Sequence, residues 1–96
     1  MIPKVVNKRA LPSDCTAENS IYIGRPTMWG NPFPITKTCT RKQSIAKFKA
    51  YFASSARLLT AVRTLARYKY LICFCAPQPC HGDVYIEYLR KIQKEM

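Results

Sequence analysis

The side chains best suited to chemistry in this chain are thiols and an imidazole gathered in one short segment. Three of the five cysteines and the only histidine lie within nine residues of the sequence YLICFCAPQPCHGD, residues 70–83. Residues two apart on a strand point to the same face, and a proline-stiffened loop could return the last two groups toward them. Three thiolates and an imidazole would form a tetrahedral zinc site, although CxCx4CH is not a common ligand spacing. The candidate metal ligands are Cys73, Cys75, Cys80 and His81.

The same segment permits two other interpretations. Cys80 and His81 lie where a helix is expected to begin, and a helix N-terminus in a basic chain lowers the pKa of a thiol. Cys80 would then be a nucleophile, with His81 in an acid or base role, acting on a nucleotide or a modified base. Alternatively, the cysteines are small buried hydrophobes and His81 helps to cap the helix. The sequence leaves metal binding, catalysis and packing open.

A second informative stretch, GRPTMWGNPFP at residues 24–34, carries the only tryptophan. Its two glycines and three prolines predict a loop of defined shape. An indole could stack on a base, a guanidinium could bind phosphate, and an amide could bond to a base edge or a sugar hydroxyl. The alternative is that the tryptophan belongs to the core and the amide closes a turn. The residues predicted to bind a ligand are Arg25, Trp29, Gly30, Asn31 and, from the later helix start, Asp83.

The charge distribution favours an anionic partner. Sixteen Lys and Arg residues oppose five Asp and Glu residues, which gives a net charge of +11. No carboxylate side chain lies between Asn19 and Gly82, whereas ten basic residues do. A field of one sign attracts the phosphates of a nucleotide or a nucleic acid.

The elements that must position these residues are short. Runs of apolar and β-branched residues predict strands at Val5–Val6, Ile21–Ile23 and Tyr70–Cys75. A chain of 96 residues can bury one small core. We therefore expect a single α/β domain over residues 1–96 with its core at roughly 4–94, in which a short sheet of about three or more strands packs with about three helices.

Helical spacing of apolar residues fills most of the remaining chain. The first helix is expected from Thr40, because Thr40 and Gln43 have the spacing of a capping box. A second apolar stripe spans Leu58–Ala66, and the last helix is expected from about Asp83 to Lys94. The charge of Asp83 would meet the positive end of that helix dipole, which explains this residue without a catalytic role.

The expected location is the cytoplasm, or the host cytoplasm if the chain is encoded by a phage. No apolar run is long enough to span a bilayer, and the first fifteen residues lack the apolar centre of a secretory signal. An odd number of clustered cysteines is typical of a reducing compartment. We therefore expect no membrane partner.

Two motifs in the chain resemble those of a known family. The stretches YIGRPTMWGNPF, residues 22–33, and LICFCAPQPCHGDV, residues 71–84, are similar to the family catalogued as domain of unknown function 4326, which is common in bacteriophages and bacteria. The resemblance runs from about Val5 to the end and implies a compact α/β unit of phage or bacterial origin. Phe74 stands where the family usually has tryptophan, and residues 67–69 replace its usual glycine turn. The family has no settled activity, so the resemblance implies fold and origin more than function.

These features predict a small basic phage-type protein that binds a nucleotide or nucleic acid. The expected pocket lies between the Gly24–Phe33 loop and the Cys80–Asp83 helix start. One alternative is an enzyme that uses Cys80 and His81 on a nucleotide or modified base. Another is a zinc-stabilised module that binds and modulates a host factor. The first prediction depends on the two sequence motifs lying on the same side of the molecule.

Overall fold

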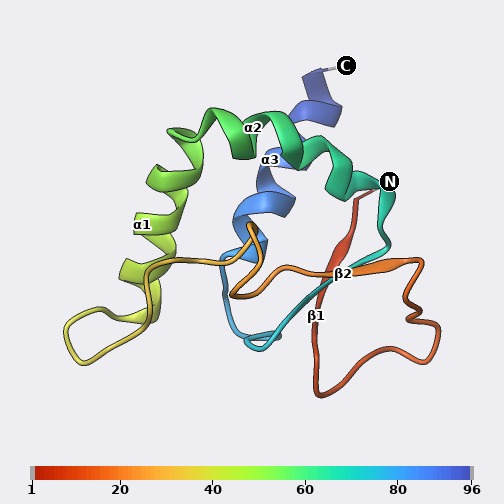
Figure 1. The fold of residues 1–96 in the computed structure, drawn as a ribbon, viewed down its shortest axis with the longest axis horizontal. Helices are drawn as coiled ribbons and strands as arrows, with labels where there is room; N and C mark the ends of the chain where they lie inside the picture. Colours follow the sequence, from red (N-terminus) through yellow and green to blue (C-terminus); the bar gives the residue numbers. More distant parts are fainter. Residues whose placement is uncertain (1, 96) are drawn as a thin grey trace.

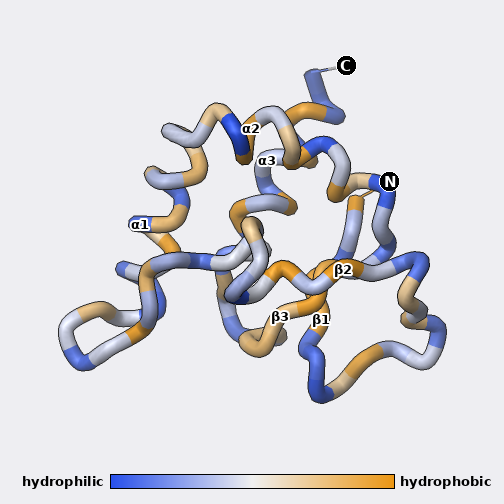
Figure 2. Tube along the Cα trace, viewed as in Figure 1, coloured by the Kyte–Doolittle hydropathy of each residue, from blue (hydrophilic) through white to orange (hydrophobic). Residues whose placement is uncertain are grey.

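A three-stranded parallel sheet lies at one side of the molecule in the computed structural model, which describes residues 2–95. Strand β3, Tyr70–Cys73, is central, with β1, Lys4–Asn7, and β2, Ser20–Tyr22, on either side of it (Figure 1). Figure 2 shows that hydrophobic residues concentrate where these three strands lie side by side. Because both pairings are parallel, the carboxyl ends of all three strands meet at one edge of the sheet. The predicted α/β class is confirmed.

The last strand is shorter than predicted, because it ends at Cys73 rather than at Cys75. After Cys73, the backbone groups form hydrogen bonds outside the sheet. The Gln78 amide donates to the Cys75 carbonyl oxygen at 2.8 Å, which closes a turn, and the Asn7 side chain donates to the Ala76 carbonyl oxygen at 2.8 Å. Cys73 and Cys75 therefore do not share one face of a strand.

Three α-helices and one 3-10 helix complete the fold. Helix α1, Arg41–Ala53, helix α2, Ala56–Ala61, and the 3-10 helix η1, Val62–Arg67, carry the chain from β2 back to β3, and α3, Gly82–Glu95, follows the sheet (Figure 1). The second apolar stripe was predicted as one helix, but it divides into α2 and η1. Its buried side chains at positions 62 and 65 are three residues apart, and a 3-10 helix places residues at that spacing on one face.

Helix α1 begins at the capping box that the sequence predicts. The Gln43 amide donates to the Thr40 hydroxyl at 3.2 Å, and the Thr40 amide donates to the Gln43 side-chain oxygen at 2.9 Å. Two backbone donors at the start of the helix are thereby satisfied. This cap fixes the position of the first turn of α1, which faces the carboxyl edge of the sheet.

The hydrophobic core lies between α1, α3 and the sheet. Tyr85 of α3 is fully buried, and its ring meets the rings of Phe48 and Phe52 of α1 edge-on, each at 5.4 Å between centroids. Gly82 lets the start of α3 approach the sheet, because a Cβ atom there would lie 2.8 Å from Ile23 Cδ1. No helix within residues 2–95 has the length and apolar character needed to cross a membrane.

Candidate functional site

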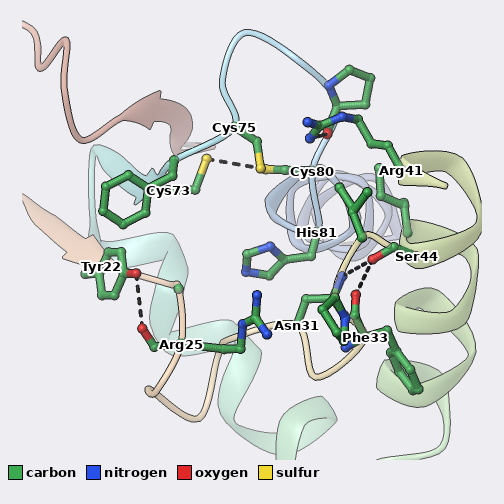
Figure 3. A pocket seen from close by; sticks show the side chains of 16 residues that line it. Tyr22, Arg25, Asn31, Phe33, Arg41, Ser44, Cys73, Cys75, Cys80 and His81 are labelled. Carbon is green, nitrogen blue, oxygen red and sulfur yellow. Dashed lines mark hydrogen bonds between the residues drawn. The ribbon is translucent and has the colours of Figure 1, made fainter. Parts of the chain in front are cut away.

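A pocket of about 490 Å³ opens at the edge of the sheet where β2 and β3 end (Figure 3). Its volume lies in the range of small-molecule sites, and ligands of open α/β sheets bind outside the carboxyl ends of the strands. Residues of both sequence motifs line it, including Arg25 and Asn31 from the first and Cys80 and His81 from the second. Strand β3 therefore brings together two motifs that are separated by helices α1 and α2 in the chain.

Among residues 2–95, the charged side chains that line the pocket are two arginines and no carboxylate. Arg25 follows β2, and Figure 3 shows its side chain directed into the pocket toward His81. Its guanidinium makes no hydrogen bond to residues 2–95, so its donors are available to a ligand. Arg41 stands at the start of α1 and donates through Nη1 to the Pro79 carbonyl oxygen at 3.1 Å, which holds the β3–α3 loop beside the pocket.

Asn31 and Ser44 form a hydrogen-bonded pair, which we call the polar bracket, between the Gly24–Phe33 loop and α1. The Asn31 Nδ2 donates to Ser44 Oγ at 2.8 Å, and Asn31 Oδ1 accepts from the Phe33 amide at 2.9 Å. Ser44 Oγ in turn donates to the Phe33 carbonyl oxygen at 2.5 Å. The bracket fixes the loop against α1, and one Asn31 N–H remains for a ligand.

Trp29 lies in the core rather than in the pocket. Its side chain is 6% exposed, and its ring meets the Tyr85 ring edge-on at 5.5 Å between centroids. The Tyr85 hydroxyl also donates to the Trp29 carbonyl oxygen at 2.7 Å. Trp29 therefore belongs to the core, which was the alternative given in the sequence analysis. Its indole is not available for stacking on a ligand.

Two further residues that were predicted to bind a ligand have roles in the structure of the loop and the helix instead. Gly30 packs against the backbone of Arg25, where an added Cβ would lie 2.8 Å from the Arg25 nitrogen, so it shapes the loop that presents the guanidinium. Asp83 does not line the pocket; its Oδ2 accepts from the Cys80 amide at 3.0 Å. The carboxylate therefore caps the start of α3, the role that the helix dipole alone predicts.

An aromatic pair, of which Phe74 is exposed and Tyr22 is partly buried, lines the pocket where Trp29 does not. Phe74 is 51% exposed and meets the Tyr22 ring edge-on, with 5.9 Å between centroids; we call these two residues the aromatic shelf. The Lys8 Nζ lies 5.2 Å from the Tyr22 centroid and 5.5 Å from the Phe74 centroid, and the Arg9 guanidinium carbon lies 5.8 Å from the latter. Sequence reasoning missed the shelf, whose signal was an aromatic residue between two cysteines directly after a buried strand.

His81 is 8% exposed, and its hydrogen-bond partner is a backbone carbonyl oxygen rather than a thiol. Its Nε2 lies 2.7 Å from the Ile23 carbonyl oxygen, so Nε2 carries the proton and donates it, because a carbonyl oxygen only accepts. Burial lowers the pKa of His81 below its usual range and favours the neutral ring. Among the described residues, no hydrogen bond joins Cys80 to His81, so they do not form a nucleophile and base pair in this structure.

Cys73 and Cys80 form a close pair of thiols, with 3.5 Å between their sulfur atoms. The hydrogen bond between them lowers the pKa of Cys73 to about 6, against the opposing effect of burial. The same interaction with Cys73, followed by burial, raises the pKa of Cys80. The sequence predicted a lowered pKa for Cys80 from its place near a helix start. The structure adds a factor that the sequence could not show: a second buried thiol lies beside Cys80, and in such a pair the ionisation of one thiol opposes the ionisation of the other.

The four candidate zinc ligands are not arranged as a metal site. Within residues 2–95, no group of three or more His, Cys, Asp or Glu side chains is placed to hold a metal ion. Cys75 lies beyond the end of β3, and His81 Nε2 is occupied by the Ile23 carbonyl oxygen. The residues present therefore do not fit a closed zinc centre with four ligands.

Comparison with known proteins gives one match. A family model described as a domain of unknown function, DUF4326, matches residues 6–91. This range includes both sequence motifs and every charged or aromatic side chain at the pocket. No protein with a curated description and no solved structure matches the chain. The phage or bacterial origin implied by the resemblance stays a prediction.

Proposed function

The chain belongs to the family described as a domain of unknown function, DUF4326, and from the geometry of its pocket we propose that it binds a nucleotide, either free or as the end of a nucleic-acid strand. One observation carries the proposal: among the described residues, the pocket is lined by two guanidinium groups and no carboxylate, and the exposed Phe74 ring lies beside it with Tyr22 and Lys8. A nucleotide combines a polyanionic group with a flat aromatic base, and these two surfaces complement its two parts.

The phosphate would lie near Arg25. Its guanidinium points into the pocket, makes no hydrogen bond to the described chain, and can form two parallel bonds to phosphate oxygens. Arg41 adds a second positive charge from the opposite wall, although one of its donors already binds the Pro79 carbonyl oxygen. Since no carboxylate lines the pocket, an anion entering it meets attraction from both sides.

The base would stack on the aromatic shelf. Phe74 exposes half of its side chain at the pocket, and stacking on an aromatic ring contributes about 1–3 kcal/mol per base without strong sequence preference. Lys8 and Arg9 lie beside the same rings, where their charges can reach the backbone of a strand that continues past the pocket. This arrangement accommodates both a free nucleotide and a strand end.

The two alternatives expected from the sequence have less support. For an enzyme that uses Cys80 or His81, the described residues give no hydrogen bond by which His81 could activate Cys80, and His81 Nε2 is engaged by the Ile23 carbonyl oxygen. A zinc-stabilised module would need converging ligands, which the described residues do not provide. We therefore carry neither forward as the main function.

The test compares binding by the pocket variants Arg25→Gln and Phe74→Ala with binding by the unchanged chain. Dissociation constants are measured by calorimetry for mononucleotides and by fluorescence anisotropy for labelled single strands and duplexes, at low salt. Loss of one stacked base should weaken binding by roughly 5- to 150-fold for Phe74→Ala. Loss of a charged hydrogen bond should weaken binding by roughly tenfold or more for Arg25→Gln.

Matched controls come from the opposite end of β3. Tyr68 and Arg67 form a similar cation and ring pair, with the guanidinium carbon 5.7 Å from the ring centroid, but neither residue lines the pocket. Tyr68→Ala and Arg67→Gln should bind like the unchanged chain. The proposal is wrong if no nucleotide or oligonucleotide binds the unchanged chain, or if the control variants weaken binding as much as the pocket variants.

A further inference from the structure

The proposed nucleotide site leaves the two close thiols without a role. Cys73 stands at the carboxyl end of β3, and Cys80 stands two residues before α3, so the tertiary fold alone brings them together. Their sulfur atoms are 3.5 Å apart, and both residues line the pocket although they are only 2% and 3% exposed. The two sulfur atoms must approach by about 1.5 Å to reach the S–S bonding distance of about 2.05 Å.

The surroundings of the pair favour sulfur chemistry. The Gly82 amide donates to Cys80 Sγ at 3.3 Å, at the start of a 14-residue helix, so a backbone donor supports negative charge on the pair. The pocket adds the positive charges of Arg25 and Arg41 and no carboxylate. A thiolate is the form of cysteine that attacks a disulfide, and the partner thiol and the Gly82 amide stabilise it against the opposing charge of Asp83.

We propose that Cys73 and Cys80 form a redox-active dithiol that reduces small anionic disulfides entering the pocket. The Cys73 thiolate attacks one sulfur of the disulfide RSSR, its S–S bond breaks, and the departing thiolate takes up a proton. Cys80 then loses its proton and attacks the Cys73 sulfur of the mixed disulfide, which releases the second thiol. Two electrons pass from the protein to RSSR. One proton comes from Cys80 and the other from solvent, because Cys73 begins as a thiolate, and the products are two RSH and one Cys73–Cys80 disulfide.

The charge of the pocket defines the class of oxidant. A small disulfide that carries carboxylates, such as oxidised glutathione, complements the two guanidinium groups that line the pocket. A cationic disulfide such as cystamine would be repelled by the same charges. The proposal does not depend on nucleotide binding, because it requires only the thiol pair and the positive field around it.

The experiment exposes the reduced, folded chain to oxidised glutathione and, separately, to cystamine. Free thiols are then trapped with a maleimide in denaturant, and the products are identified by intact mass and by peptide mapping. We expect loss of two of the five thiols, a Cys73–Cys80 disulfide, and at least tenfold faster oxidation by oxidised glutathione than by cystamine. The reaction should reverse with reduced glutathione.

Variants separate this pair from the other cysteines. Cys15 lies on the loop between β1 and β2 and does not line the pocket, so Cys15→Ser should form the same disulfide at the same rate. Cys80→Ser should stop at a glutathione adduct on Cys73. Circular dichroism checks that each variant is folded. If a variant is unfolded, the peptide map of the oxidised unchanged chain shows which cysteines form the disulfide. The proposal is overturned if all five thiols survive in the folded chain, if the disulfide uses another cysteine, or if it forms only after unfolding.

Discussion

The sulfur atoms of Cys73 and Cys80 lie 3.5 Å apart, so the ionisation of each thiol depends on the protonation state of the other. When the first thiol ionises, the remaining S–H can donate to the new thiolate, and the second ionisation must then place two negative charges in contact. The lower pKa belongs to Cys73, at about 6, and that of Cys80 is raised. At neutral pH the pair therefore carries one negative charge.

This shared ionisation predicts an absorbance change. Titration at 240 nm should show one thiolate per chain forming near pH 6, well below the usual value of about 8.5 for a thiol. Cys80→Ala removes the donor and should move this step upward, whereas Cys15→Ser should leave it unchanged.

The same lowered pKa affects stability in a defined direction. Between about pH 6 and about pH 8.5, the unfolded chain binds a proton at Cys73 that the folded chain does not bind, so this thiol makes folding more favourable as pH rises. Its stabilisation is lost as pH falls through about 6. A pair that showed no thiolate below pH 8 would contradict the hydrogen bond between the two sulfurs.

At the scale of single elements, the first turn of α1 places three groups of the pocket at once. Arg41 ties the β3–α3 loop to the helix, Ser44 holds the loop that carries Asn31, and Ile45 contributes apolar lining. The turn has no acidic residue to complement the helix dipole. The capping box at Thr40 is therefore its main local stabilisation.

The cap gives a prediction about stability. Thr40→Ala should reduce the free energy of unfolding by about 1 kcal/mol, which lowers the melting temperature of a domain of this size by roughly 4–8 °C. Thr38→Ala is the matched control, because the Thr38 hydroxyl lies on the exposed loop before the helix and contacts only Thr36. Thermal denaturation followed by circular dichroism measures both. Equal melting temperatures for the two variants would show that the cap does not stabilise α1.

At the scale of the whole molecule, the charge of +11 attracts polyanions over a surface larger than the pocket. Binding of a nucleic-acid strand by such a surface releases counterions, so its affinity falls as salt increases. In the proposed binding mode, the cations that contribute are those beside the strand, and Lys8 at the aromatic shelf is one of them.

The slope of affinity against salt tests this placement. For a single-stranded oligonucleotide, Lys8→Gln should reduce the slope of log K against log salt by about 0.7, the amount expected for one lost phosphate contact. Lys94→Gln is the control, because Lys94 lies in the last turn of α3, about 18 Å along the helix from the pocket end. Slopes that change equally in the two variants would indicate a diffuse attraction rather than a strand path across the shelf.

The sequence by itself determined most of the secondary structure and the fold class. Short β-branched runs predict the three strands, and the Thr40–Gln43 spacing predicts the start of α1, because both signals depend on residues close together in the chain. The positive field and the absence of acids over a long central stretch are also properties of the sequence alone. The two motifs identified the segments that meet at the pocket.

Only the tertiary structure decided which side chains line the pocket. Trp29 is buried because its large apolar ring packs against the Tyr85 ring. Phe74 is exposed because β3 ends at Cys73 and the chain then turns away from the sheet. The contact between Cys73 and Cys80 depends on the turn after β3, and the occupied Nε2 of His81 depends on the end of β2. These outcomes follow from distances between residues remote in the chain or separated by an irregular loop, which local sequence patterns do not encode.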